Sequence, residues 1–265
     1  MASNARALRD ALAIQLRAIG AVMIREFVAR WGRGNLGFAW LYGESLLFSF
    51  PVLIVWHYVR PSFEGGVPML PLLWTGYMPI LMFRHVIGIN LRPITANRGL
   101  LYHQRITPLD IFFGRSLLEI FGIFSAVPFS WWVWHIFGFM DWPQNYRLML
   151  LGYFYMAWWV IDFALITAAL SERSEIIQHL WSPLSYLYIF WSGFFFLAEW
   201  MPYRLRVFAV WIDPPLDCYE IIRSGFFGTG IHPYYNLPHL SYMLSILLFL
   251  GLWLFKDVRR YIVFE

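Results

Sequence analysis

Hydrophobic and polar positions occur along this chain in long blocks, and six hydrophobic blocks are long enough to cross a lipid bilayer. A transmembrane helix needs about 20 mostly apolar residues. Inside lipid, a chain must pair its backbone amides within the same segment, which favours helices. The predicted spans are residues 36–58, 70–95, 109–138, 147–170, 178–199 and 238–255. The pattern therefore predicts an all-α, polytopic membrane protein with six transmembrane helices.

A further helix is predicted just before the first span, in residues 22–33. At 100° per residue, one face carries Met23, Ile24, Phe27, Val28 and Trp31, and the other carries Arg25, Glu26, Arg30 and Arg33. Such a pattern is typical of an amphipathic helix that lies in the membrane interface. Two roles stay open: a plain membrane anchor, or a substrate entrance at which Arg25, Arg30 and Arg33 meet an anionic molecule.

The segment between the last two spans, residues 200–237, contains two short apolar pieces. These pieces, 204–212 and 216–227, are separated by Asp213-Pro214-Pro215, and each is too short to span a bilayer. Because a proline pair ends a helix, we predict a re-entrant helical hairpin that dips into the outer leaflet, with Asp213 or Asp217 as the cap of its second helix. A folded surface loop is the alternative.

The positive charges set the expected orientation. With the N-terminus inside, 14 of the 20 lysines and arginines fall in cytoplasmic segments and 5 in outer segments, which favours two cytoplasmic termini. The predicted parts are a cytoplasmic amphipathic segment (1–35), a transmembrane domain (36–255) that includes a cytoplasmic segment (96–110) and the outer hairpin (200–237), and a cytoplasmic tail (256–265).

Composition and missing motifs narrow the possible functions. Charged residues make up 14% of the chain, against about 25% in soluble domains, and the net charge of +4 is too small to indicate nucleic-acid binding. The single cysteine, Cys218, allows no internal disulfide. Since the only lysine, Lys256, follows no glycine-rich segment, the chain has no phosphate-binding loop of its own. We predict no cofactor, metal ligand or catalytic residue in it.

Four ionisable residues lie at similar depths in the predicted spans: Glu44, Arg84, Glu119 and Asp162. Charges inside a membrane are costly unless they are paired or hydrated. Arg84 is the only base in this buried ionic group, so we expect it to pair with Glu119 or Glu44. A structural ion pair and a proton relay are both consistent with the pattern.

Two spans carry polar and aromatic residues on one face. In the span 178–199 this face holds Trp181, Ser185, Tyr188, Ser192, Phe195 and Glu199, and the opposite face holds Pro183, Leu187, Phe190, Phe194 and Leu197. The first span repeats the pattern with Phe38, Tyr42, Ser45, Ser49 and Trp56. Aromatic rings stack on sugar faces and hydroxyls exchange hydrogen bonds with them, so both faces are candidates for lining a polysaccharide channel. Ordinary helix packing is the alternative.

The order of these features resembles a known family, the membrane permeases of type 2 ABC exporters, in the branch that exports capsular polysaccharide and O-antigen. The resemblance covers nearly the whole chain and lies in REFVARWGRGNLGFAW (25–40), RITPLDIFFGRSLLE (105–119), SGFFF (192–196), DPPLDCYEIIRSGFFG (213–228) and the terminal KDVRRYIVFE. One departure is Asp213 before Pro214, where the family usually has asparagine.

The resemblance implies a homodimer in the bacterial inner membrane that works with two separate ATP-binding cassette subunits, which hold the ATP and Mg. It places the ATPase contact in residues 96–110, where Arg98, Arg105 and Asp110 are the candidates. Lipid-linked capsular polysaccharide would pass between the two permeases toward periplasmic and outer-membrane export proteins. An exporter of O-antigen, teichoic acid, lipids or drugs on the same scaffold, a membrane-embedded transferase and a scaffold without a substrate are the alternatives.

Overall fold

The computed structural model describes residues 2–31, 40, 42–44, 46, 47, 50, 51, 63, 64, 67–101 and 106–258. The helices in these residues are α1 (Ala2–Trp31), α3 (Met69–Ile89), α4 (Arg98–Leu101), α5 (Pro108–Ile136), α6 (Tyr146–Arg173), α7 (Glu175–Trp191), α8 (Tyr203–Ile212), α9 (Pro214–Phe227) and α10 (Leu237–Phe255), with single turns η1 (Thr95–Asn97), η2 (Ala198–Trp200) and η3 (Gly228–Gly230). Strands β1 (Phe63–Glu64) and β2 (Val67–Pro68) form one antiparallel pair. The helical class predicted from the sequence is confirmed.

Four of these helices are long and apolar enough to cross a membrane: α3, α5, α6 and α10. They correspond to the predicted spans at 70–95, 109–138, 147–170 and 238–255. The predicted first span, 36–58, lies largely outside the described residues. The helix in the predicted span 178–199 is α7, which has 17 residues.

The end of α7 differs from the prediction. The helix stops at Trp191, and Gly193 has a φ of +85°. Residues just past a helix end commonly adopt this left-handed conformation, which glycine tolerates without strain. Phe194, Phe195 and Leu197 therefore lie in a turn after the helix, and their assignment to helix faces was wrong.

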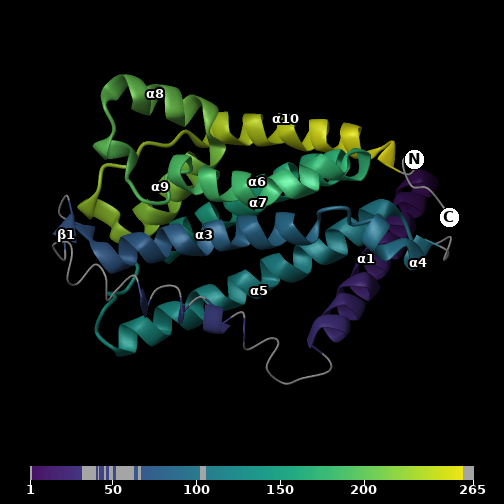
Figure 1. Cartoon of the computed structure of the whole chain (residues 1–265), viewed down its shortest axis with the longest axis horizontal. Coiled ribbons are helices and arrows are strands. Elements are labelled where there is room, and N and C mark those ends of the chain that lie inside the picture. The colour runs from purple at the N-terminus through teal and green to yellow at the C-terminus, as the bar shows by residue number, and fades with distance from the viewer. Residues whose placement is uncertain are drawn as a thin grey trace.

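The long helices α3, α5, α6, α7 and α10 run lengthwise side by side, and α8 lies on the outside of this bundle (Figure 1). The beginning of α1 and the end of α10 lie at the same end of the molecule, near α4 (Figure 1). The helix α9 is buried along its whole length. It packs mainly against α6.

Glycines allow the close approach of α9 and α6. A Cβ atom at Gly152 would come within 2.6 Å of Ile222, and one at Gly225 would collide with Met149. Small residues at helix contacts let backbones approach closely in membrane proteins. The helices predicted at 204–212 and 216–227 are confirmed as α8 and α9, whereas a dip into the membrane is not tested by the structure.

The helix α1 is much longer than the predicted 22–33, and it crosses α5 obliquely (Figure 1). At the crossing, Val22 packs against Gly114. Ile24 and Val28 are exposed, whereas Glu26 is buried. Two residues of the predicted apolar face therefore point away from the rest of the described chain, while Glu26 of the predicted charged face packs against the bundle.

Candidate functional site

The buried helix α9 holds the turn that follows α7. The guanidinium of Arg223 is fully buried and donates to the carbonyl oxygens of Gly193 (2.8 Å), Phe194 (2.6 Å) and Phe196 (2.6 Å). These carbonyls lie beyond the helix end, where no helical N–H is available to them. Arg223 thus connects the SGFFF segment with the second helix of the hairpin, two of the segments that carry the family resemblance.

Two buried acids of α9 hold neighbouring loops in the same way. Glu220 accepts hydrogen bonds from the backbone N–H groups of Ala198 (3.0 Å) and Tyr234 (3.1 Å). Asp217 accepts one from the N–H of Asn236 (3.4 Å). Burial raises the pKa of Asp217 to about 7, although the hydrogen bond from Asn236 opposes this shift. The helix therefore fixes the turn after α7 and the loop before α10 together.

The aromatic and hydroxyl residues predicted to line a channel on α7 pack inside the chain. The ring of Tyr188 lies 5.2 Å from that of Phe83 and stacks on Trp159 at 5.8 Å, and Trp181 lies 5.3 Å from Phe83. The hydroxyl of Tyr188 donates to Asp213 at 2.8 Å. Asp213 is the N-cap residue of α9 but makes no side-chain capping bond there.

The serines of this face are also internal. Ser185 and Ser192 are buried, and each hydroxyl donates to a carbonyl of its own helix. On the opposite side of α7, Leu187 is 66% and Phe190 is 70% exposed. Phe195 in the following turn is 37% exposed and stacks on Phe190. In the structure, the polar face of α7 contacts α3 and α6.

The matching face of the first predicted span is described only at Tyr42. Its hydroxyl donates to Ser125 of α5 at 3.1 Å, and its ring meets Phe129 edge-on. Phe38, Ser45, Ser49 and Trp56 lie outside the described residues.

The ionic group inside the bundle has different partners from those expected. Glu119 of α5 forms an ion pair with Arg30 of α1 and lies 3.4 Å from His85 Nδ1. His85 Nε2 lies 3.3 Å from Glu44, so the imidazole connects two carboxylates. Arg30 also approaches Glu26 at 3.4 Å. The charges of α1, α3 and α5 thus form one connected network.

Arg84 does not belong to this network. It donates to the hydroxyl of Tyr186 at 2.8 Å, and its guanidinium lies 4.4 Å from the centre of that ring. The expected pairs of Arg84 with Glu119 or Glu44 were wrong, because Arg30 approaches from α1 and His85 lies between the two acids. Asp162 is fully buried, and its carboxylate has no hydrogen-bond partner among the described residues.

The arginines of the predicted entrance are partly engaged. Arg25 donates to Asn97 of η1 at 3.0 Å, which links α1 to the predicted ATPase-contact segment. Arg30 is paired as described, and Arg33 lies outside the described residues.

The segment before α5 is fastened to the junction between α6 and α7. Glu172 accepts hydrogen bonds from the N–H of Ile94 (2.7 Å) and from the N–H and hydroxyl of Thr95 (3.0 and 2.6 Å). Arg92, with a φ of +50°, pairs with Glu175 at 2.6 Å. These bonds fix the beginning of η1 against α6.

The three predicted ATPase contacts occupy different environments. Arg98 begins α4, and Arg105 lies outside the described residues. Asp110 is 1% exposed, forms a capping box with Thr107 and accepts a hydrogen bond from Gln15 at 2.6 Å. This geometry makes Asp110 part of the α1–α5 contact and leaves it little surface for another protein.

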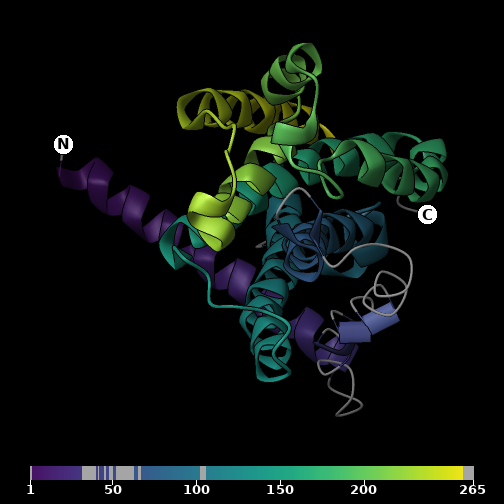
Figure 2. The same ribbon diagram turned by 90° about the vertical axis from the view of Figure 1, so that its left-hand side faces the viewer.

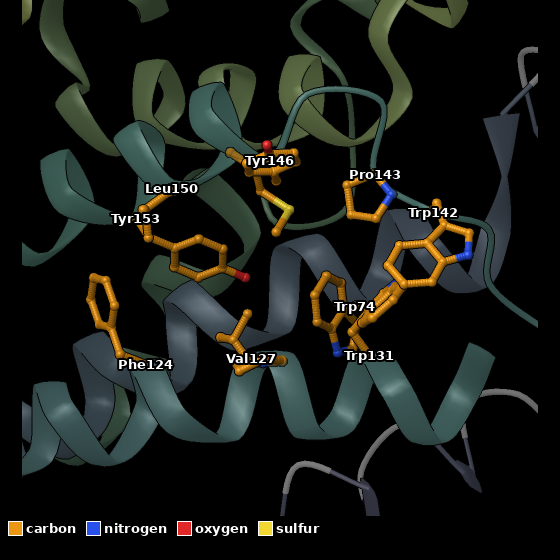
Figure 3. A pocket seen from close by; sticks show the side chains of 11 residues that line it. Trp74, Phe124, Val127, Trp131, Trp142, Pro143, Tyr146, Leu150 and Tyr153 are labelled. Carbon is orange, nitrogen blue, oxygen red and sulfur yellow. The ribbon is translucent and has the colours of Figure 1, made fainter. Parts of the chain in front are cut away.

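An apolar cavity of about 340 Å³ lies where α5 ends and α6 begins (Figure 3). It is lined by Trp74, Phe124, Val127, Pro128, Trp131, Trp142, Pro143, Tyr146, Met149, Leu150 and Tyr153. The hydroxyl of Tyr153 points into it (Figure 3) and has no hydrogen-bond partner within the described ranges. Such a lining suits an apolar group.

Comparison with known proteins identifies the family. The chain is 32% identical, over 95% of its length and 95% of the relative's, to the capsule polysaccharide export inner-membrane protein BexB of Haemophilus influenzae. It is also 32% identical, over 92% of its length and 91% of the relative's, to CtrC of Neisseria meningitidis serogroup A, which has the same description. The chain belongs to the capsule polysaccharide export inner-membrane protein family. No family model matches it.

A more distant relative is the polysialic acid transport protein KpsM of Escherichia coli, which is 22% identical over 94% of this chain and 96% of its own length. These similarities confirm the predicted resemblance to a polysaccharide-export permease. With the four apolar spans, they also support a multi-pass protein of the inner membrane.

Sequence reasoning missed several residues that organise this family member. His85 was not assigned to the ionic group, although it directly follows Arg84 in a predicted span. Glu172 was not singled out, and Arg223 was counted only among the positive charges of the outer segments. The available signal at Arg223 was a charged residue in an otherwise apolar piece, since a buried charge requires a partner.

Proposed function

We propose that the chain is the transmembrane subunit of an ATP-driven exporter that moves lipid-linked, anionic capsular polysaccharide from the cytoplasm to the periplasm. The observation that carries this proposal is the 32% identity to capsule export inner-membrane proteins over nearly the full length of both chains. The polytopic helical fold supports it. Partners in the periplasm and outer membrane would continue the route.

A deletion in the bacterium that carries the gene tests this function. We expect the polysaccharide to accumulate inside the cell and the surface capsule to disappear, and we expect the wild-type gene to restore both. A normal surface capsule in the deletion strain would contradict the proposal. A loss of polymer synthesis, with no internal accumulation, would instead favour the alternative of a membrane-embedded transferase.

The energy would come from two separate ATP-binding cassette subunits, with their own ATP and Mg. The only lysine of this chain lacks a phosphate-binding loop, and the purified chain is therefore expected to hydrolyse no ATP. Glu172 of α6 accepts hydrogen bonds from Ile94 and Thr95, directly before and at the start of η1. A movement of an ATPase bound to 96–110 would therefore be transmitted to α6, which supports a contact in this segment. ATP hydrolysis by the chain alone would contradict this division of labour.

The proposed topology has six spans and two cytoplasmic termini. The segments 36–58 and α7 would be the first and fifth spans, α1 would lie along the inner interface, and the α8–α9 hairpin would re-enter the outer leaflet. The exposed Ile24 and Val28 on α1 support contact with lipid. Cysteines in the N-terminal segment and at the exposed Arg204 of α8 should react with an impermeant reagent from opposite sides of the membrane.

The translocation channel is proposed between two copies of the chain, with the polar face of α7 as one wall. Because Ser185 and Ser192 are buried and the rings of Trp181 and Tyr188 lie against Phe83 of α3 in the structure, this role requires α7 to move away from α3 during transport. With Cys218 replaced by alanine, a cysteine at Ser192 should become reactive to a water-soluble thiol reagent only when the ATPase subunits turn over. A cysteine at Leu187 is the control on the opposite face. Protection of Ser192→Cys in every state would leave this face as helix packing.

Export of O-antigen, teichoic acid, lipids or drugs remains the alternative within transport. Relatives described as capsule exporters favour capsular polymer over these.

A further inference from the structure

A cleft of about 310 Å³ lies between α8 and the beginning of α10. These two helices are neighbours in both views of the molecule (Figures 1 and 2). The cleft is lined by Tyr203, Arg206, Val207, Val210, Trp211, Pro233, Tyr234, Tyr235, Asn236 and His239. Its volume is at the lower end of the range of about 300–1,000 Å³ found for small-molecule sites.

One wall is a single face of α8. Its five lining residues stand at positions i, i+3, i+4, i+7 and i+8, the spacing of one helix face. Tyr203 is 72% exposed and Trp211 is 57% exposed, so their rings are open to a ligand. Arg204 and Phe208 lie on the same helix but outside the cleft.

The other wall is held rigidly by α9. Its buried acids Glu220 and Asp217 bind the backbone N–H groups of Tyr234 and Asn236, the two residues that lead into α10. Asn236 caps α10 through the N–H of His239 at 3.2 Å. Since these bonds fix the loop before any ligand arrives, the cleft is preorganised.

The two walls also touch each other. His239 Nε2 lies 3.2 Å from the carbonyl oxygen of Trp211, and the two rings are 4.2 Å apart. The guanidinium of Arg206 lies 3.9 Å from the centre of the Tyr234 ring and 5.8 Å from that of Tyr203.

The charge of Arg206 is uncompensated within the cleft. None of the ten lining residues is acidic. Across the described part of the chain, no ion pair within 4.0 Å joins Arg206 to a carboxylate. Aromatic faces on both sides of one arginine, with an amide and an imidazole beside them, form a site for a ring that carries an acidic group.

We propose that this cleft binds one acidic sugar unit of the exported polymer. The proposal rests on the proposed export function and adds a specific site to it. The exposed rings of Tyr203 and Trp211 would stack on the apolar faces of the sugar, and Arg206 would bind its carboxylate or phosphate through charge-assisted hydrogen bonds. Because the cleft offers four aromatic rings and only one cation, it fits a sugar better than a phospholipid headgroup.

Direct binding tests the proposal. The complete exporter is placed in phosphatidylcholine nanodiscs and titrated calorimetrically with short oligosaccharides cut from the capsule of the bacterium that carries the gene. A second sample of the oligosaccharides, neutralised by methyl esterification, is the ligand control. We expect the acidic oligosaccharides to bind and the esterified ones to bind at least about tenfold more weakly, since the charge-assisted bonds to Arg206 are lost.

Matched variants locate the site. Arg206→Gln should weaken binding about tenfold, whereas Arg204→Gln, two positions away on the same helix, should change it less than about twofold. Trp211→Leu and its control Phe208→Leu test the stacking in the same way. Each variant is first compared with the wild type by melting temperature, so that a folding defect is recognised, and Arg206→Lys provides a gentler second change.

Several results would overturn the proposal. These are an absence of binding by the native oligosaccharides, equal binding after esterification, and equal effects of Arg206→Gln and Arg204→Gln. Displacement of the sugar by added phosphatidylglycerol, with stronger lipid binding at Arg206, would assign the cleft to a lipid headgroup instead. Export by the wild-type protein in proteoliposomes is measured in parallel. Export without site-specific binding would reject the sugar site in the cleft but not the export function, whereas an absence of export would reject the function.

Discussion

Two regions of this protein engage charged side chains in contacts between segments, and they use them in different ways. Where α1 crosses α5, charged side chains pair with one another, through Arg30, Glu119, His85 and Glu44. In α9, a charged side chain binds backbone groups instead, as Arg223 does with three carbonyl oxygens. The first arrangement joins helices to each other, and the second fixes loops to a helix.

The difference has a physical consequence for each region. A side-chain pair stabilises the fold only while both partners carry their charges, and replacing both partners by apolar groups can be nearly neutral. A backbone carbonyl group, by contrast, is the same in every residue, and no substitution removes it. Loss of its buried donor therefore leaves an unsatisfied polar group, at about 1–3 kcal/mol each. The α9 contacts should consequently tolerate substitution less well than the α1–α5 network.

The largest expected effect follows from Arg223→Met. This change leaves three buried carbonyl groups without their donor. We expect the free energy of unfolding to fall by about 1–3 kcal/mol for each group, or the protein to fail to fold. Fluorescence-detected size-exclusion chromatography and the melting temperature in detergent measure it. Arg204→Met, on the exposed helix α8, is the control. A melting temperature for Arg223→Met equal to that of the control would remove the distinction between the two regions.

A smaller effect is expected in the α1–α5 network. Arg30→Met removes one of the two partners of the buried Glu119, since His85 remains 3.4 Å away. The loss in the free energy of unfolding should therefore stay below the about 3–5 kcal/mol of a buried charge that has lost its only partner. The double change Arg30→Met with Glu119→Gln should recover part of this stability, because no carboxylate then needs a partner. Arg17→Met is the control on the same helix, since Arg17 bonds only to the nearby carbonyl of Ala13 among the described contacts. Simple addition of the two single effects would show that the residues are not coupled.

The pH dependence of stability gives a further test of the buried acids on α9. Burial raises the pKa of Asp217 to about 7 in the fold, whereas a free aspartate has a pKa of about 3.9. The folded state therefore holds this proton more tightly than the unfolded state, and stability falls as the pH rises from about 4 to about 7. Asp217→Asn should flatten the melting-temperature profile between pH 5 and pH 8. A profile as steep as that of the wild type would mean that other groups cause the slope.

The smallest expected effect is that of Arg84→Leu. This arginine contacts only Tyr186 among its described side-chain partners, and a partly exposed cation–ring contact contributes about 0.5–1 kcal/mol. The melting temperature should fall slightly, and Tyr186→Phe, which keeps the ring and removes the hydroxyl, should have an even smaller effect. Rescue of Arg84→Leu by Glu119→Gln would restore the pairing expected from the sequence and contradict the structure.

Much of the helical framework was predictable from the sequence. The spans α3, α5, α6 and α10 follow from hydrophobic length alone, because lipid requires about 20 apolar residues in each. The division of the hairpin into α8 and α9 follows from Pro214 and Pro215, which permit a helix start but not a helix interior. These features depend on local chemistry, and neighbouring segments do not alter them.

The partners of the charged residues depended on the tertiary structure. Residues 30, 85 and 119 meet because α1 crosses α5 beside α3, and no sequence spacing encodes that crossing. In the same way, the polar face of α7 is visible in the sequence, but the helices that cover it are not. The sequence by itself determined that this chain is a helical membrane protein of the export family type. How the helices pack decided three other features: the partners of the charged residues, the covering of the polar face of α7, and the cleft beside α8. Each of them needs residues from segments far apart in the chain.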